Sequence, residues 1–220
     1  FRKMAPDEIS QRAKDLNRRA SSVNMHDHMM FEFAIHRALG EKNVFDTYYL
    51  PELRKGGFTT FITTVGANSP CMCTLSDYLE FGCFEQIDML RQEEREGASF
   101  KICRNMTDVE QAHAEGKIAL IMAFEGARAL EGRPWEESLV MLRTYFELGV
   151  CVNCIAGGAR TVFADGMGDI RAHAGLTTFG VKLVEEMNRL GILIDLAHMT
   201  DRSFFDVMET TTQPIMVSHV

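Results

Sequence analysis

The sequence predicts an α/β fold with a parallel sheet, and the architecture that suits it best is a (β/α)8 barrel of the TIM type. Six short strand-like runs alternate along the chain with segments whose apolar residues recur at helical spacing. The runs are unevenly spaced, with a long interval between the second and the third, which favours a barrel with insertions over a compact doubly wound sheet. No glycine-rich phosphate loop follows the first run, which argues against a dinucleotide-binding fold.

Composition indicates one globular domain over residues 1–220. The chain is 46% hydrophobic and 25% charged, and it contains no repeat or linker. Its net charge of -8 argues against nucleic acid or an anionic membrane as the main partner, and no apolar run is long enough for a membrane span. We therefore expect a small-molecule or dipeptide substrate and leave a homodimer open. The six cysteines follow no secreted-scaffold spacing, so we expect free thiols and a cytoplasmic location.

The first two elements are a helix and a strand. Pro6 opens the helix, whose apolar face comprises Ile9, Ala13, Leu16 and Ala20. The strand covers 23–28, where His26 and His28 share one face because they lie two residues apart. Two imidazoles at this spacing form a natural chelate for a divalent ion. The alternative is a pair of ordinary core or surface histidines.

The central segment leads to a buried carboxylate. Residues 31–56 are mixed, with a short helix at 52–55, and a strand at 58–65 precedes a helix at 76–96. A capping box at 107–110 begins another short helix before the strand at 117–125. Glu125 ends the inward row of that strand, where a carboxylate is costly unless a cation or hydrogen-bond donors meet it. A salt bridge to Arg128 is the alternative.

The last third of the chain alternates regularly. Helices at 134–148, 177–190 and from 200 onward separate strands at 150–155, 192–196 and 215–217. Cys151 and Cys154 lie inside a strand, which favours core packing over a redox or zinc pair. Strand alternation places His198 and His219 at the ends of two neighbouring strands, on one rim. It turns Asp195 to the face opposite His198, where we expect it to form a hydrogen bond that supports a metal ligand or faces a helix.

Four strand ends thus carry residues that bind metals: His26, His28, Glu125, His198 and His219. Parallel strands present their carboxyl ends at one edge of a sheet, so these side chains should meet there. Together they supply nitrogen and carboxylate ligands for two divalent ions, with Glu125 bridging ions about 3.5–4 Å apart.

The chain resembles the membrane (renal) dipeptidase family of metallopeptidases, within the wider amidohydrolase group. The resemblance rests on Glu125–Gly126, 148–150, Ala164–Asp165, 175–180, 186–191, 195–198 and Ser218–His219. It implies a (β/α)8 barrel with two zinc ions and a metal-bound hydroxide that attacks the peptide bond of a dipeptide. Carried over by match, His26, His28 and Glu125 would hold one zinc ion, and Glu125, His198 and His219 the other. Glu125 is then the central catalytic residue.

Three departures from the family pattern bear on function. His28 stands where the family has an aspartate, and Gly157 stands where it has a substrate-binding histidine. Arg160, in the same loop as Gly157, is predicted to bind a substrate carboxylate instead. Because Val220 follows a ligand-bearing strand, we expect that about six of the eight βα units are present and that the barrel is truncated at its C-terminus.

Three functions remain open from the sequence. The extent of the resemblance favours a zinc dipeptidase. His28 and Gly157 favour a hydrolase for another small amide, an N-acyl amino acid or a lactone. The position of the chain's end favours a non-catalytic barrel that binds metal.

Overall fold

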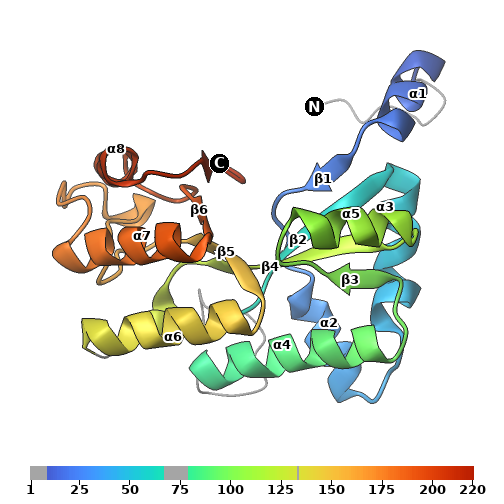
Figure 1. The fold of residues 1–220 in the computed structure, drawn as a ribbon, viewed down its shortest axis with the longest axis horizontal. Helices are drawn as coiled ribbons and strands as arrows, with labels where there is room; N and C mark the ends of the chain where they lie inside the picture. The colour runs from blue at the N-terminus through green and yellow to red at the C-terminus, as the bar shows by residue number, and fades with distance from the viewer. Residues whose placement is uncertain (1–8, 67–78, 133) are drawn as a thin grey trace.

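The computed structural model describes residues 9–66, 79–132 and 134–220. One parallel sheet curls through the described chain into a half-barrel, which confirms the predicted fold class (Figure 1). Its strand order is β1-β2-β4-β5-β6-β7, with β3 beside β4. The strands are β1 (Ser22–Asn24), β2 (Phe58–Thr64), β3 (Phe100–Ile102), β4 (Ile118–Glu125), β5 (Val150–Cys154), β6 (Leu193–Asp195) and β7 (Ile215–Met216).

Helices surround this sheet. They are α1 (Gln11–Arg19), α2 (Met30–Ala38), α3 (Leu50–Gly56), α4 (Leu79–Arg95), α5 (Met106–Ala114), α6 (Trp135–Glu147), α7 (Thr178–Leu190) and α8 (Asp201–Thr210). A π-helical turn (Phe45–Tyr49) and two 3-10 turns (Arg128–Leu130 and Met167–Asp169) complete them. None of the helices in the described ranges combines the length and the apolar character needed to cross a membrane.

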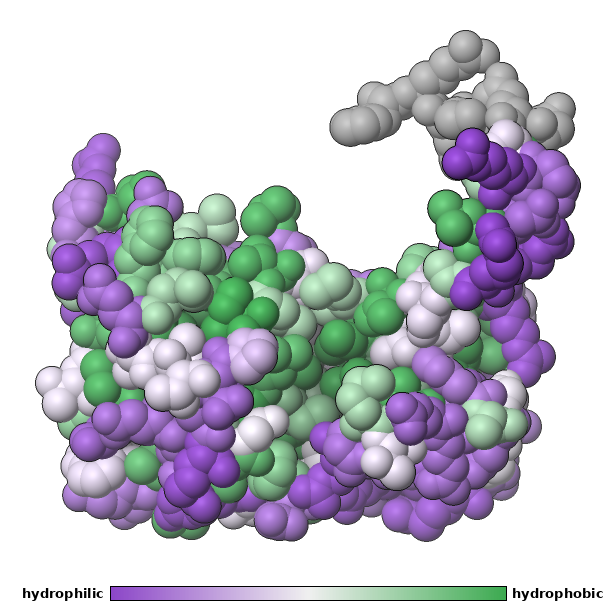
Figure 2. Space-filling model, turned by 45° about the horizontal axis from the view of Figure 1, so that its top comes forward, coloured by the Kyte–Doolittle hydropathy of each residue, from purple (hydrophilic) through white to green (hydrophobic). Residues whose placement is uncertain are grey.

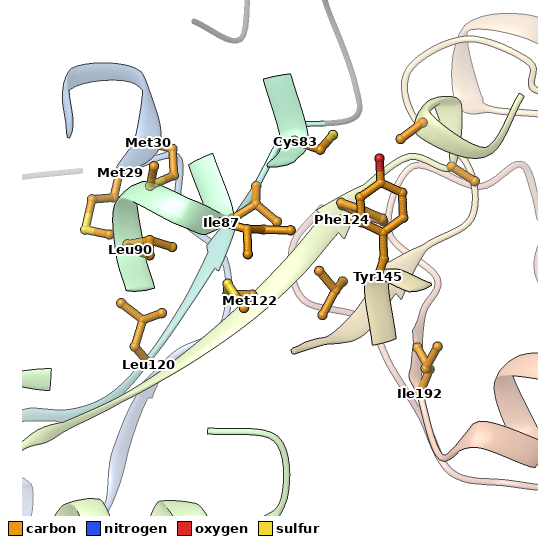
Figure 3. Packing of buried hydrophobic residues seen from close by; sticks show 14 of the residues in the cluster. Met29, Met30, Cys83, Ile87, Leu90, Leu120, Met122, Phe124, Tyr145 and Ile192 are labelled. Carbon is orange, nitrogen blue, oxygen red and sulfur yellow. The ribbon is translucent and has the colours of Figure 1, made fainter. Parts of the chain in front are cut away.

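The central strand β4 has two buried faces with different partners. Figure 3 shows the outer face packed beneath helices, with Leu120, Met122 and Phe124 beside Ile87, Leu90 and Tyr145. The inner face of β4 carries the aliphatic Ile121 and the small Ala123. These side chains belong to one apolar cluster with Ile62 of β2, Val152 of β5 and Leu193 of β6. Figure 2 shows a hollow on one side of the molecule with apolar residues gathered in it. Glu125 ends the inner row, as the sequence predicts.

Strand β3 is an element that the sequence analysis missed. It pairs with the first half of β4, from Ile118 to Leu120, whereas β5 pairs with the second half from Met122 onward. Three residues with Lys101 in the middle give too short a pattern to predict a strand. The six predicted strands are the six of the continuous path, and β3 lies in the long interval that suggested an insertion.

The prediction for the first helix is wrong in part. Its predicted start at Pro6 lies outside the described residues, and α1 runs from Gln11, with the Ser10 hydroxyl accepting a hydrogen bond from the Ala13 amide. The predicted apolar face is not buried, since Ile9 is 43% and Leu16 60% exposed. Helix α1 lies at one end of the molecule (Figure 1), and no other element of the described chain buries its apolar residues.

The segment between β1 and β2 contains more helix than predicted. Helix α2 and the π-helical turn stand where only a helix at 52–55 was expected. The turn depends on distant residues, because the buried Glu93 carboxylate of α4 accepts a hydrogen bond from the Phe45 amide at 2.6 Å. The Phe45 ring also packs 4.8 Å from Phe100. Both contacts join residues far apart in the sequence, so local sequence patterns could not predict the turn.

Helix ends agree with the sequence in most places. Thr177 and Thr200 cap α7 and α8 by accepting hydrogen bonds from backbone amides, as expected. For α5 the predicted capping box is displaced, because Asn105 is the cap and accepts from the Asp108 amide at 3.0 Å. The predicted helix start at Ser76 lies outside the described residues.

The two cysteines of β5 are free thiols, Cys154 fully buried and Cys151 partly buried. Burial raises the pKa of each thiol, that of Cys151 to about 11. The Cys154 thiol donates to the carbonyl oxygens of Ala156 and Ala197, both at 2.9 Å. These contacts agree with core packing rather than a redox pair. Cys71 and Cys73 lie outside the described residues.

An ion pair between α6 and α7 should make stability depend on pH. Hydrogen bonds from Arg189 and Arg143 hold the pKa of Glu186 at about 2, well below the usual range of a glutamate. A lowered folded-state pKa adds stability that is present above the unfolded pKa and disappears as the pH falls through about 2. Because Arg143 and Arg189 are 42% and 60% exposed, solvent screening limits the expected loss in Glu186→Gln to about 1 kcal/mol near neutral pH.

Urea unfolding at several pH values tests this prediction. The stability difference between the wild type and Glu186→Gln should shrink as the pH falls below the unfolded pKa. Glu185→Gln is the matched control, since Glu185 is 53% exposed and its ion pair with Lys182 spans a single turn of the same helix. An equal loss in both variants, or a difference that does not change with pH, would contradict the prediction.

Candidate metal centre

The structure brings all five predicted metal-binding side chains together at the carboxyl edge of the sheet. Glu125 is the last residue of β4, and the histidines lie in the short segments that follow β1, β6 and β7. They form two groups that share the glutamate. One is His26, His28 and Glu125, the other Glu125, His198 and His219, and in each the candidate ligand atoms lie within 4.8 Å of one another.

The first group surrounds one oxygen of the shared carboxylate. His28 Nε2 lies 3.3 Å and His26 Nε2 3.8 Å from Glu125 Oε2. The two ring nitrogens are 3.1 Å apart. Oε2 is buried and, although His28 is near, no contact to it has the geometry of a hydrogen bond. A buried carboxylate oxygen facing two imidazoles suits a cation.

The second group surrounds the other oxygen. His198 Nε2 lies 2.7 Å and His219 Nε2 3.9 Å from Glu125 Oε1. The two ring nitrogens are 2.8 Å apart. The rings of His26 and His219 stack with centroids 3.8 Å apart, so the two groups are in direct contact. Glu125 therefore offers a different oxygen to each group.

These distances fit a pair of divalent cations. Two nitrogens that bind one tetrahedral zinc at about 2.0–2.1 Å lie about 3.3 Å from each other. The observed separations of 3.1 and 2.8 Å approach that value. Four imidazoles and one carboxylate also match the ligand types that zinc prefers. The salt bridge suggested as the alternative for Glu125 is replaced by the histidine contacts, and Arg128 Nε instead lies 3.9 Å from Glu131.

The charges of these groups favour cation binding. Burial, followed by the charge of His219, lowers the pKa of His26 to about 4, and burial lowers the pKa of His219 too. Both rings are then neutral near pH 7, with lone pairs free to bind. Burial alone would raise the pKa of Glu125, but the hydrogen bond with His198 and the nearby histidines outweigh it and lower the pKa. The same hydrogen bond raises the pKa of His198.

Three of the histidine rings are oriented by a contact at Nδ1, the ring nitrogen that faces away from Glu125. Nδ1 of His28 lies 3.2 Å from Thr64 Oγ1, and Nδ1 of His219 lies 2.8 Å from Ser218 Oγ. Nδ1 of His198 lies 3.4 Å from the sulfur of Met167. In each case Nε2 faces Glu125. Sequence reasoning missed these three partners, and only Ser218, next to a predicted ligand, carried a signal that could have found it.

Strand alternation did not place the histidines correctly. Strands β1, β6 and β7 end before the histidines, which lie in the segments that follow, and His198 has a left-handed φ of 65°. The prediction that Asp195 faces away from His198 is wrong. Asp195 is in register with Cys154, which is in register with Glu125, so its side chain lies on the same face as Glu125. The chain bends after Asp195, which brings His198 to that face.

Arg160 lies in the loop that follows β5, as expected. Its Nε is 3.2 Å from an oxygen of the buried Asp165, and its amide donates to Asp169 at 2.6 Å. The side chain is 46% exposed. Within the described ranges, no hydrogen bond or ion pair joins Arg160 to the five metal-centre residues. Its role in substrate binding stays a prediction.

Close backbone packing in this loop supports the metal centre. The Met167 amide donates to the His198 carbonyl at 2.7 Å. A Cβ added at the neighbouring Gly166 would lie 2.3 and 2.4 Å from the carbonyl oxygens of Gly157 and Ala159. Because those atoms are backbone, Gly166→Ala should lower the free energy of unfolding by about 1–3 kcal/mol and displace His198. Chemical denaturation and zinc titration would measure both effects.

A matched control lies in the same loop. Nothing is within 4 Å of a Cβ added at Gly158, so Gly158→Ala should change stability by less than about 0.5 kcal/mol. Equal stability in the two variants would show that the close approach of backbone atoms at Gly166 does not stabilise the loop.

Comparisons with known proteins identify the family of this chain. The family model described as "Membrane dipeptidase (Peptidase family M19)" matches residues 10–220. Dipeptidase 3 of Rattus norvegicus is 32% identical over 155 residues, which cover 68% of this chain and 30% of that protein. Dipeptidase 3 of Homo sapiens is 34% identical over 140 residues, covering 61% and 27%. The matched region thus spans less than a third of these relatives.

Two solved structures share the fold. The crystal structure of the dipeptidase AC, a metallopeptidase of family M19, superposes with a TM-score of 0.75 at 24% identity, covering 91% of this chain and 63% of that one. A metallopeptidase from Rhodobacter sphaeroides, liganded with a phosphinate mimic of the dipeptide L-Ala-D-Ala, gives a TM-score of 0.74 at 23% identity, covering 90% and 64%.

Proposed function

Since the chain belongs to the membrane dipeptidase family, peptidase family M19, we propose that it holds two zinc ions and hydrolyses the peptide bond of dipeptides. The observation that supports this most is the shared glutamate. Glu125 presents Oε2 to His26 and His28 and Oε1 to His198 and His219. One carboxylate between two histidine pairs suits a site for two metal ions, the kind of site that several classes of hydrolase use.

Each residue has a defined part in the proposal. His26 and His28 would hold one ion and His198 and His219 the other, with Glu125 bridging them. Two zinc ions held there would lower the pKa of a water molecule toward neutrality and polarise the substrate carbonyl. Burial of Glu125, which is 5% exposed, keeps bulk water away from the carboxylate and strengthens its attraction for the cations. A hollow beside His26 and His28, also lined by Phe31 and Tyr49, provides room at the rim.

Zinc content and zinc-dependent hydrolysis of dipeptides test the proposal together. Zinc per chain should be near two by elemental mass spectrometry on protein purified without chelator. Zinc-loaded protein should hydrolyse dipeptides, and removal of the zinc with a chelator should abolish the activity until zinc is restored. A ratio near zero, or full activity after chelation, would contradict the proposal.

Two residues support a second candidate function. His28 replaces a carboxylate with an imidazole, and Gly157 offers no side chain where the family has a histidine that binds substrate. Hydrolysis of another small amide, an N-acyl amino acid or a lactone would accommodate both changes. A panel of dipeptides, N-acyl amino acids and lactones, compared by kcat/KM, separates the two candidates.

Arg160 is proposed to bind the substrate carboxylate. Asp165 engages its Nε, which leaves the two terminal nitrogens of the guanidinium to face a carboxylate in a forked geometry. A hydrogen bond to a charged group contributes about 1.5–3 kcal/mol, so Arg160→Ala should lower kcat/KM by about 10- to 100-fold. Steady-state kinetics with a dipeptide, and with the same dipeptide amidated at its carboxyl end, would measure the effect.

The controls separate binding from folding. Arg171→Ala removes an exposed arginine from the same loop and should leave kcat/KM unchanged. A melting temperature measured for each variant shows whether loss of the contact with Asp165 destabilises the loop. Unchanged kcat/KM in Arg160→Ala, or an equal loss with the amidated dipeptide, would remove Arg160 from the substrate site.

A further inference from the structure

One buried carboxylate connects the two turns that carry His198 and His219. Asp195 is 3% exposed. Its Oδ1 accepts hydrogen bonds from the amides of Ala197 at 3.1 Å and Ser218 at 3.0 Å. Each of these amides belongs to the residue that directly precedes one of the two histidines. Asp195 therefore fixes both turns from a single point.

The same carboxylate also acts on one imidazole through a hydroxyl. The Ser218 hydroxyl donates to Asp195 Oδ2 at 2.5 Å, and its oxygen lies 2.8 Å from Nδ1 of His219. A hydroxyl has one proton, and here Asp195 receives it, so Ser218 must accept a hydrogen bond from Nδ1–H of His219. That arrangement keeps the proton of His219 on Nδ1 and leaves the lone pair of Nε2 directed at Glu125 and His198.

The first group of ligands has a separate support. Nδ1 of His28 lies 3.2 Å from Thr64 Oγ1. The amide and the hydroxyl of Thr64 also contact the carbonyl oxygen of Asp27, at 3.0 and 3.2 Å. Thr64 belongs to β2, on the far side of β4 from β6 and β7. The two histidine pairs are thus oriented by different strands.

We propose that Asp195 and Ser218 are positioning residues that set the zinc affinity of the group formed by Glu125, His198 and His219. Thr64 sets the zinc affinity of the other group, which is formed by His26, His28 and Glu125. The inference rests on the proposed function, because it assumes that both groups bind zinc. It predicts that the two affinities can be lowered one at a time, although the groups share Glu125.

Zinc titration of the metal-free protein tests the proposal. Calorimetry with a competing chelator should resolve two sites in the wild type. Ser218→Ala should weaken one of them by about 10- to 100-fold and leave the other within about threefold. Ser218→Thr, which keeps the hydroxyl, should restore the affinity. Thr64→Val should weaken the other site, and the double variant Ser218→Ala with Thr64→Val should weaken both.

A second measurement does not depend on zinc. Nitrogen-15 spectra of the histidines in the metal-free wild type should show His219 protonated on Nδ1, and in Ser218→Ala the proton should distribute over both ring nitrogens. Equal weakening of both sites by Ser218→Ala, or an unchanged tautomer in that variant, would overturn the proposal. If the wild type binds fewer than two zinc ions, the proposed function fails instead, and the tautomer spectrum still decides the role of Ser218.

Discussion

Replacing Glu125 with glutamine should remove most of the bound zinc and nearly all of the hydrolytic activity. Among the residues that the structure describes, this carboxylate is the one shared by both ligand groups, and its hydrogen bond with His198 helps to keep it ionised. A neutral amide leaves two cations facing His26 and His219 rings that are themselves neutral. Because such metal ions contribute several kcal/mol to catalysis, kcat/KM should fall by about 10³-fold or more. Zinc per chain should fall from about two to below one.

Elemental mass spectrometry and a dipeptide assay on the same preparation measure both effects. Glu147→Gln is a suitable control, because Glu147 ends helix α6 with a side chain that is 76% exposed. That variant should keep its zinc and its activity. Two zinc ions per chain in Glu125→Gln would show that the glutamate does not bridge the ions, and normal activity would show that it is not catalytic.

Truncating Phe124 to alanine should be the most destabilising of the substitutions considered. Phe124 is 1% exposed, and its ring meets the Tyr145 ring edge to face at 4.8 Å (Figure 3). Loss of a fully buried phenylalanine costs about 3–5 kcal/mol. Since Phe124 directly precedes Glu125 in β4, the cavity should also loosen the metal centre and weaken zinc binding. Urea denaturation of the metal-free protein would isolate the effect on packing.

A second phenylalanine provides the control. Phe81 lies on α4 and is 56% exposed, so Phe81→Ala should change the free energy of unfolding by less than about 0.5 kcal/mol. A loss below about 1 kcal/mol in Phe124→Ala would mean that the contact between β4 and α6 is not part of the stabilising core.

The long elements of the fold could be predicted because their patterns are local. Strands β2 and β4 are continuous apolar or β-branched runs. Helices α7 and α8 each begin after a threonine N-cap, which can be recognised in the sequence. Elements defined by distant contacts could not be predicted. The π-helical turn depends on Glu93, which lies on another helix, and β3 is too short to show a period. Helix α1 has an amphipathic pattern, but amphipathic character alone does not guarantee a partner.

The candidate site could be predicted as a set because parallel strands present their ends at one edge. This rule brought the five residues together without any knowledge of the turns that follow the strands. It could not give the path of those turns, and so it misplaced Asp195 relative to His198. The contacts of Thr64 and Ser218 with the imidazoles follow from the same turns and need coordinates to be seen.

The stacked rings of His26 and His219 lie in the segments that follow β1 and β7, the two edge strands of the sheet path. Zinc ions joined through Glu125 would therefore act as a cross-link between segments near opposite ends of the chain. In the denatured ensemble such a link closes a very long loop, and for a loop on the order of 100 residues the loss of chain entropy corresponds to about 4–5 kcal/mol. Zinc should consequently make the two edges of the sheet unfold together, and its removal should let them unfold separately.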